Sequence, residues 1–295
     1  MSATLLSAHL TQCFSVLDRT IVFTTDSSDV MRYFQATYRR LMTDGAAPNA
    51  PRDVAAIIYS DETTPRVTFN GAPVEMSSKR LDSPFHAAFH GSSKLFRLSM
   101  RLGGAWQSVY AAAVRVKNRA VLIAAPTNTG KTTLALELIR RGARLYGDEF
   151  VCIRTSDNVA CAFPRTLMIR EKTLALVTDA RLNASVAGVE PRVTASGEKV
   201  WDFVDAGAVY GESVWAQPAP LGAAVLLCRG SGAQTSIERI SPAAASMELA
   251  TRFNTERLEF AQLAGIAQMF ASLPCYRLSA GNPRAAAGAL LETLG

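Results

Sequence analysis

The chain has 295 residues, 48% of them apolar, which is enough for one large domain or two modest domains with a sizeable core. Its net charge of +6 suits an acidic partner such as a nucleotide, but no basic run is interleaved with aromatic residues, so we expect no nucleic-acid binding. No charged leader precedes an apolar segment at the N-terminus, and no apolar stretch approaches about 18 residues, so we expect neither a signal peptide nor a membrane span.

The cysteines are odd in number and show no C-x-x-C spacing. This pattern is typical of reduced core residues in a cytoplasmic protein, whereas a redox or metal role is the alternative. The five cysteines are Cys13, Cys152, Cys161, Cys228 and Cys275.

Residues 1–100 are predicted to form a small α+β domain with a role in recognition of a substrate or partner. A helix is expected over Met31–Met42, capped by Asp26, Ser27 or Ser28, because apolar residues recur there at helical spacing. Asn70-Gly71 is a hairpin signal between two strands. The strands predicted in this segment are Thr20–Thr24, Asp53–Tyr59, Arg66–Asn70 and Pro73–Met76.

His86 and His90 lie four residues apart in Pro84–His90, a spacing that would place both on one face of a helix. Such a pair can bind a metal ion. The neighbouring Phe85 and Phe89 instead favour an amphipathic segment, and no third ligand is apparent nearby. We therefore expect the two histidines to pack as part of the structure.

The middle of the chain reads as a strand, a loop and a helix in immediate succession. A first strand is expected over Ser108–Val116, and Ala120–Ala125 is an apolar run short enough for a second, buried strand. Pro126–Thr129 is polar turn sequence, and Leu134–Arg141 has the apolar spacing of a helix.

The pattern G-x-x-x-x-G-K-[ST] of a P-loop is met from Ala125 to Thr132, with Ala125 in place of the first glycine. Main-chain N–H groups and the helix N-terminus form the phosphate cradle of such a loop, and a small alanine is compatible with it. Lys131 would reach the terminal phosphates, and Thr132 would bind Mg²⁺ through its hydroxyl. The alternative is a Gly-Lys-Thr that merely opens a helix. The residues predicted to bind the nucleotide are Ala125, Thr127, Asn128, Thr129, Gly130, Lys131, Thr132 and Thr133.

An acidic pair, Asp148 and Glu149, follows the loop after only one helix and one short strand. The helix is expected to end at Gly142, and the chain would then return towards the sheet. We predict that Thr132, Asp148 and Glu149 hold the metal and that Asp148 is a catalytic base. A solvated turn after a strand is the alternative for the acidic pair.

The segment T-G-K-T-T-L-A-L-E-L-I-R-R-G-A-R-L-Y-G-D-E resembles the catalytic domain of the HPr kinase family. Over a shorter span it is similar to the nucleotide-binding core of ATP-dependent phosphoenolpyruvate carboxykinases. The resemblance is strongest over Tyr110–Arg170 and does not include residues 1–100. It implies an α/β fold with a P-loop catalytic domain over residues 101–295, ATP and Mg²⁺ as cofactors, and assembly into homo-oligomers.

Two positions depart from the family pattern. Tyr110 stands where HPr kinases commonly carry a histidine, and Met168 in L-M-I-R-E stands where they carry a glutamate. At position 110 a phenol replaces an imidazole that could assist proton movement, so Tyr110 is expected either to hydrogen-bond a phosphate or substrate or to pack in the core. Met168 puts in doubt both recognition of HPr and the reverse, phosphorolytic activity. The segment around Leu167–Arg170 resembles the one that closes over the nucleotide, so Arg165 or Arg170 is expected to meet the γ-phosphate, and we assign Arg170 to catalysis together with Asp148 and Lys131.

The C-terminal part continues with alternating elements. Residues 183–220 are rich in small residues and are interpreted either as a lid or substrate-facing loop or as weakly patterned core. The later elements expected are a strand over Leu221–Cys228, helices over Pro242–Phe253 and Leu258–Ala271, a strand over Cys275–Leu278 and a helix over Pro283–Leu294 capped by Asn282.

These features predict an ATP-dependent kinase that transfers a phosphoryl group to a hydroxyl, with serine or threonine of a peptide or protein as the acceptor. Phosphoryl transfer requires positioned charge more than covalent chemistry, which a P-loop and an acidic pair supply. A kinase of small-molecule hydroxyls is one alternative. A second is a non-catalytic module in which a bound nucleotide controls the binding of a partner.

Overall fold

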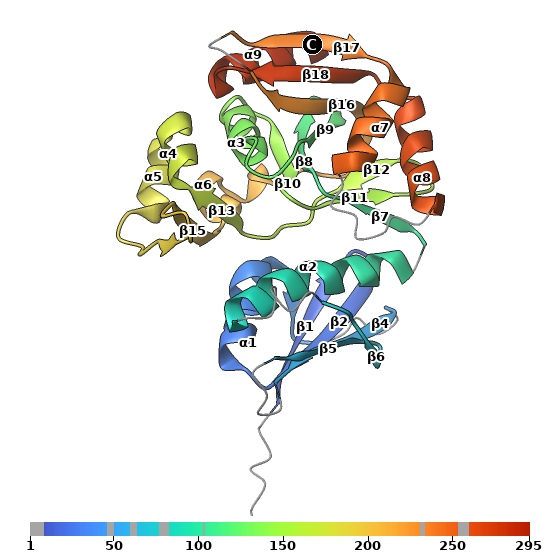
Figure 1. Cartoon of the computed structure of the whole chain (residues 1–295), viewed down its shortest axis with the longest axis vertical. Helices are drawn as coiled ribbons and strands as arrows, with labels where there is room; N and C mark the ends of the chain where they lie inside the picture. Colours follow the sequence, from blue (N-terminus) through green and yellow to red (C-terminus); the bar gives the residue numbers. More distant parts are fainter. Residues whose placement is uncertain are drawn as a thin grey trace, which may run out of the picture. The chain divides into compact units, whose positions relative to one another are not determined.

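The computed structural model describes residues 9–45, 50–59, 64–76, 83–102, 104–230, 234–252 and 260–295 (Figure 1). The chain divides into two compact units, Met1–Trp106 and Gln107–Gly295. Each unit combines helices with a mixed sheet, so the predicted α/β class is confirmed. No helix among these residues is long and apolar enough to cross a membrane.

The first unit is a six-stranded sheet with the strand order β3-β1-β2-β4-β5-β6. Strands β2 and β4 are parallel, and the other neighbours are antiparallel. Helices α1 (Ser28–Tyr38) and α2 (Pro84–Leu102) pack on the sheet, and a 3₁₀ turn, η1 (Arg39–Leu41), follows α1. The strands are β1 (Leu10–Val16), β2 (Arg19–Thr25), β3 (Met42–Thr43), β4 (Arg52–Ile58), β5 (Arg66–Phe69) and β6 (Ala72–Pro73).

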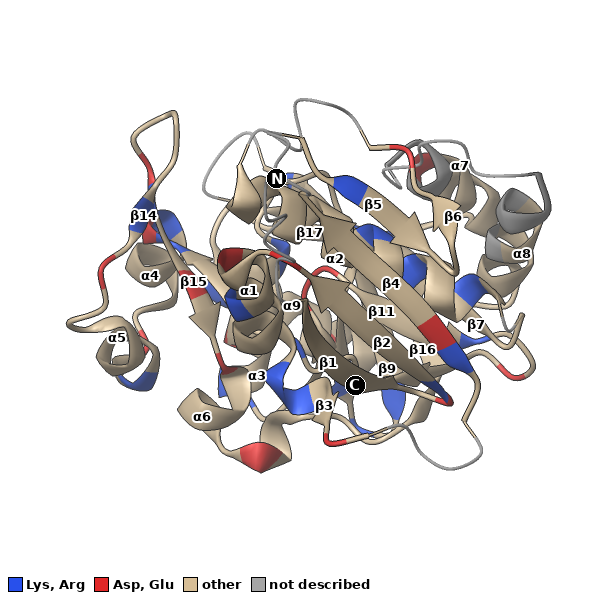
Figure 2. Cartoon of the chain, turned by 90° about the horizontal axis from the view of Figure 1, so that it is seen from below, with Lys and Arg blue, Asp and Glu red and all other residues tan. Residues whose placement is uncertain are grey.

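The core of this unit is aromatic. Phe14 of β1 and Phe23 of β2 are buried positions that alternate with less buried ones, so both point to the face that the helices cover. Phe34 of α1 stacks on Phe23 with ring centroids 3.7 Å apart, and Phe96 of α2 lies 6.0 Å from Phe14. On the other face Val54 is 53% exposed, and β1, β2 and β4 carry few charged residues (Figure 2).

The α2 helix is much longer than the predicted amphipathic segment Pro84–His90. It continues through Gly91 and Ser92, which are weak helix formers, because tertiary contacts favour the helix there. A Cβ on Gly91 would lie 2.8 Å from Ile57 Cδ1, so the small residue allows α2 to approach β4 closely. Tyr38 donates a hydrogen bond of 2.9 Å to the Ser92 hydroxyl.

Other predictions in this unit were partly wrong. Strand β1 was not predicted, and β6 contains only Ala72–Pro73 rather than Pro73–Met76. The cap of α1 is Ser27, whose Oγ accepts a hydrogen bond from Val30 N at 3.3 Å, and α1 ends before the predicted Met42.

The second unit is built on a nine-stranded sheet with the order β10-β8-β9-β16-β12-β11-β7, to which β18 and β17 are added beside β16. Strands β9, β16 and β18 are parallel to one another, and their other partners are antiparallel. The strands are β7 (Trp106–Val109), β8 (Ala112–Val116), β9 (Arg119–Ala124), β10 (Arg144–Gly147), β11 (Val151–Arg154), β12 (Val159–Cys161), β16 (Ala219–Arg229), β17 (Ser236–Ile240) and β18 (Cys275–Ala280).

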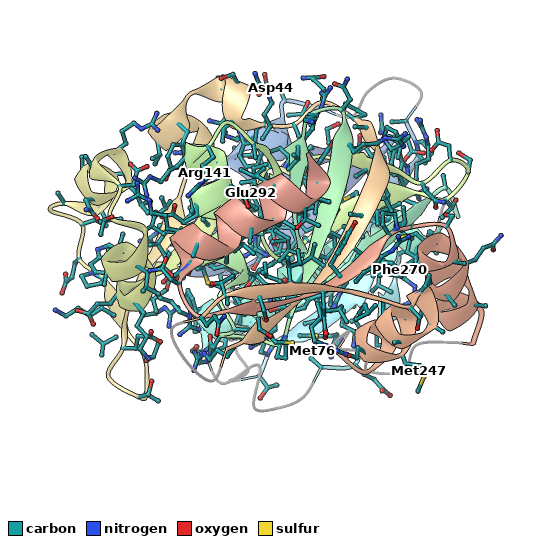
Figure 3. The ribbon with its side chains drawn as sticks, turned by 90° about the horizontal axis from the view of Figure 1, so that it is seen from above. Asp44, Met76, Arg141, Met247, Phe270 and Glu292 are labelled. Atoms are coloured by element: carbon teal, nitrogen blue, oxygen red, sulfur yellow. The ribbon has the colours of Figure 1, made fainter. Side chains whose placement is uncertain are left out.

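Helices cover both faces of this sheet. Along β9, Val121 and Ile123 face a core shared with α3 (Lys131–Arg140) and α9 (Pro283–Leu294). Leu122 faces the opposite core, which contains residues of α7 (Pro242–Arg252) and α8 (Phe260–Ala271). Phe270 of α8 belongs to this second core, whereas Met247 of α7 is exposed (Figure 3).

Most of residues 183–220, interpreted above as a lid or loop or as weakly patterned core, form regular elements. Up to Val214 they belong to a small substructure with a three-stranded sheet of order β13-β15-β14, and Ala219 begins β16 of the large sheet. Asp179 and Asp205 cap its helices, a signal that the small-residue composition obscured. The elements are β13 (Leu167–Arg170), α4 (Glu171–Val177), α5 (Ala180–Val186), β14 (Arg192–Val193), β15 (Lys199–Val204), α6 (Ala206–Tyr210) and the 3₁₀ turn η3 (Glu212–Val214).

Candidate active site

The loop between β9 and α3 has the backbone geometry of an anion cradle. Gly130 is the N-cap of α3 with φ of 112°, a conformation that only glycine adopts readily. Asn128 is also left-handed, with φ of 65°. No side chain caps the helix, so the N–H groups of its first turn are available to an anion placed over the loop.

Lys131 is the first residue of α3 and is 6% exposed. Its Nζ donates to the carbonyl oxygens of Ala125 at 3.0 Å and Pro126 at 3.3 Å. Burial lowers the pKa of Lys131, and the nearby carboxylates of Glu149 and Asp148 act in the opposite direction. The ammonium group is therefore held at the loop by neutral carbonyls, which a phosphate would replace as a stronger, charged partner.

The acidic pair reaches the loop because α3 ends sharply. Gly142 follows the C-terminal end of α3 and has a φ of 94°. Its N–H donates to Ile139 O, and Ala143 N–H donates to Leu138 O. Strand β10 then pairs with β8 and brings Asp148 back to the N-terminal end of α3. Thr132 Oγ1 donates a hydrogen bond of 3.0 Å to Asp148 Oδ2, which joins the loop to the acidic pair.

Asp148 is 4% exposed. Burial, with a further contribution from the Glu149 carboxylate, raises the pKa of Asp148 to about 6 from the usual 3.8. Arg165, the hydrogen bond from Thr132 and the charge of Lys131 oppose this rise. A carboxyl group with a pKa near neutrality can accept and release a proton under physiological conditions.

Arg165 and Arg170 lie in different environments. Arg165 is 5% exposed, and its Nη1 lies 3.2 Å from Glu149 Oε2, so its charge is beside the acidic pair. Arg170 is at the end of β13, where it forms an ion pair with Glu198. The structure thus brings Arg165, and not Arg170, to the acidic pair.

Tyr110 lies against the loop. The predicted strand Ser108–Val116 is broken into β7 and β8 at this residue, with Ala111 N–H donating to Val109 O at 3.0 Å. The Tyr110 hydroxyl is 3.3 Å from Thr127 Oγ1, and Lys131 Nζ lies 4.7 Å from the centre of its ring. Tyr110 therefore contacts both the beginning and the end of the loop.

The other predicted loop residues have varied environments. Ala125 is buried, and Thr129 N–H donates to Pro126 O at 3.3 Å. Thr133 is buried, and its hydroxyl is 3.2 Å from that of Thr173 in α4, so this side chain joins α3 to the small substructure. Arg229 at the end of β16 contacts Asn128 O, a contact that no motif in the sequence indicated.

The chemistry of these side chains fits a magnesium site. The Thr132 hydroxyl and the carboxylates of Asp148 and Glu149 are oxygen ligands, which Mg²⁺ prefers. This site has only two carboxylates, and no group of three or more His, Cys, Asp or Glu side chains that could hold a metal ion occurs anywhere in the described residues. His86 and His90 belong to an aromatic cluster with Phe85 and Phe89.

No family model matches the sequence, and no curated protein matches it either. Among solved structures, the chain is similar to the HPr(Ser) kinase/phosphatase from Coxiella burnetii. The match covers 63% of this chain and 95% of that chain, with 12% sequence identity and a TM-score of 0.33. A likeness of this size is a distant structural relationship and does not identify an activity.

Proposed function

We propose that this chain is an ATP-dependent kinase that transfers the γ-phosphoryl group of ATP to a hydroxyl of a peptide or protein. The hydrogen bond between Thr132 and Asp148 supports this proposal most directly. It connects the proposed phosphate-binding loop to a buried carboxylate, which would lie close to a ligand held by this loop. Loop, cation and carboxylate are the parts that phosphoryl transfer requires.

Each side chain has a role in this proposal. The N–H groups at the start of α3 and the Lys131 ammonium bind the phosphate chain. Asp148 accepts the proton of the acceptor hydroxyl, because its carboxylate is hydrogen-bonded to Thr132 at the loop. Arg165 stabilises the negative charge that develops on the transferred group, a role for which its place beside Glu149 is better suited than that of Arg170.

Magnesium would be held by Thr132, Asp148 and Glu149. When bound, the ion supplies positive charge that neutralises the phosphate oxygens. Arg165 would lie beside this metal site, because its Nη1 is 3.2 Å from Glu149 Oε2. Lys131 and Arg165 would thus supply two positive charges in addition to that of the metal.

The first unit is proposed to recognise the acceptor. None of the residues described above as the active site belongs to it. The sheet face opposite its two helices exposes Val54 and carries little charge, which suits contact with a peptide or protein more than with an anionic small molecule.

Formation of ADP with a panel of hydroxyl acceptors tests this function. We expect turnover with serine- or threonine-containing peptides or proteins and a much lower rate without an acceptor. Turnover with small hydroxyl compounds alone would assign the site to a small-molecule kinase. Binding of ATP without turnover for any acceptor would favour the nucleotide-controlled binding module.

A further inference from the structure

The strands beside the loop form a topological switch point. Strands β9 and β16 are parallel neighbours, with Ala124 opposite Leu226. The chain leaves β9 through α3 on one face of the sheet, whereas after β16 it passes through β17 and then α7 and α8 on the other face. In open α/β sheets, the crevice at the carboxyl ends of two such strands is where ligands bind.

Arg229 is the last residue of β16 and lies at this edge of the sheet. Ala223, Val225 and Leu227 face the core that contains α3, and the alternation along the strand carries Arg229 to the same side. Arg229 is three residues beyond Leu226, the partner of the last residue of β9, so it lies level with the loop that follows β9. The register of the two strands thus brings a cation to the loop.

The contact between Arg229 and the loop uses only part of the guanidinium. Arg229 Nη2 donates a hydrogen bond of 2.9 Å to Asn128 O, and the side chain is exposed. A guanidinium has five N–H donors, so four more are left for other acceptors. Among the described residues, no carboxylate forms an ion pair with Arg229, and its charge is not neutralised as that of Arg165 is by Glu149.

We propose that Arg229 binds the phosphate chain of the nucleotide, as a cation supplied from the strand next to the P-loop. This inference rests on the proposed function, because it assumes that the loop holds a nucleotide. Lys131 approaches the phosphates from the helix end of the loop and Arg229 approaches from its middle, at Asn128. Two cations on different elements fix the orientation of a phosphate chain better than a single lysine does.

Equilibrium binding of ATP, ADP and tripolyphosphate to the full chain, with Mg²⁺, tests this inference. Arg229→Gln removes the charge and keeps a polar side chain, whereas Arg229→Lys keeps the charge. The control is Arg239→Gln, an exposed arginine on β17 opposite Tyr276, near the amino end of β18. We expect Arg229→Gln to weaken all three ligands about tenfold and Arg229→Lys to weaken them less, with no change in the control.

The outcomes separate this inference from the proposed function. If the wild-type chain binds ATP and Arg229→Gln binds it equally well, Arg229 only supports the loop and the inference is wrong, while the kinase proposal stands. If Arg229→Gln weakens ATP but not tripolyphosphate, the contact is with the nucleoside and the assignment to phosphates is wrong. Failure of the wild-type chain to bind ATP would overturn both.

Discussion

Thr132 Oγ1 donates a hydrogen bond of 3.0 Å to Asp148 Oδ2, although the two residues are 16 positions apart in the chain. Thr132 lies in the first turn of α3, and Asp148 follows β10. The hydrogen bond therefore depends on the sharp end of α3 at Gly142 and on the pairing of β10 with β8. It fixes the carboxylate beside the loop before any ligand binds.

The raised pKa of Asp148 predicts how stability depends on pH. Because its pKa is about 6 in the folded chain and 3.8 normally, the folded state keeps a proton between these values that the unfolded state has lost. The stability contributed by the protonated form is therefore complete below about pH 4 and is lost as the pH rises through 6. In the absence of nucleotide and Mg²⁺, we expect the wild type to lose about 2 kcal/mol relative to Asp148→Asn between pH 4 and pH 7.

Chemical unfolding of the two proteins across this pH range measures the difference. Distant carboxylates change both curves equally, so the comparison reports Asp148 together with its interaction with Glu149. If stability depends on pH in the same way in both proteins, the Asp148 carboxyl group titrates normally and its environment is more polar than its burial indicates.

Lys131 is predicted to supply much of the affinity for the nucleotide. Lys131→Ala should weaken ATP binding about 10- to 100-fold, because a buried ammonium on a phosphate makes charge-assisted hydrogen bonds. Isothermal titration calorimetry of ATP with Mg²⁺ is a suitable measurement. Lys172→Ala is the control, since Lys172 is 79% exposed and lies in α4. Equal affinity of Lys131→Ala and wild type would contradict the assignment of the P-loop.

Tyr110 is predicted to position Lys131 through its ring more than through its hydroxyl. Tyr110→Phe removes the contact with Thr127 and keeps the ring below the ammonium, so we expect kcat/KM for ATP to change less than about threefold. Tyr110→Leu removes the cation–π contact, and a loss of about fivefold is expected. If Tyr110→Phe lowers kcat/KM for ATP as much as Tyr110→Leu does, the hydroxyl is the important group, and the phenol takes part in binding or chemistry.

Whether the sequence predicted an element correctly depends on whether neighbouring or distant residues determine that element. The strand, loop and helix around Gly130 and Lys131 are specified by neighbouring residues, and so is the Asn282 cap of α9. The break at Tyr110, the continuation of α2 through Gly91 and the strand β17 depend on contacts with distant residues. Likewise, the place of Arg170 beside Glu198 depends on the pairing of β13 with β15, which no local pattern indicates. The place of Arg165 beside Glu149 depends on the hydrogen bond from Phe163 N–H to Tyr146 O, another contact between distant residues.

Asp53 is predicted to be essential for the stability of the first unit. It is buried at the start of β4 and accepts hydrogen bonds from Arg19, Asn70 and Ser99. Asp53→Ala leaves the Arg19 guanidinium without its carboxylate and should cost about 3 to 5 kcal/mol. The control Asp29→Ala breaks an exposed pair with Arg32 and should cost less than about 1 kcal/mol. Equal unfolding midpoints for the two variants would contradict this assignment.

The most direct test of the kinase proposal is transfer of label from γ-labelled ATP into fractionated host lysate, with the wild type beside Asp148→Asn. Both proteins should bind ATP, because the loop and Lys131 are unchanged in the variant. We predict a labelled protein or peptide with the wild type and at least about a 100-fold lower rate of transfer with Asp148→Asn, since the variant lacks the base. Equal transfer by the two proteins would contradict the role of Asp148, and binding of ATP with no transfer by the wild type would contradict the kinase itself.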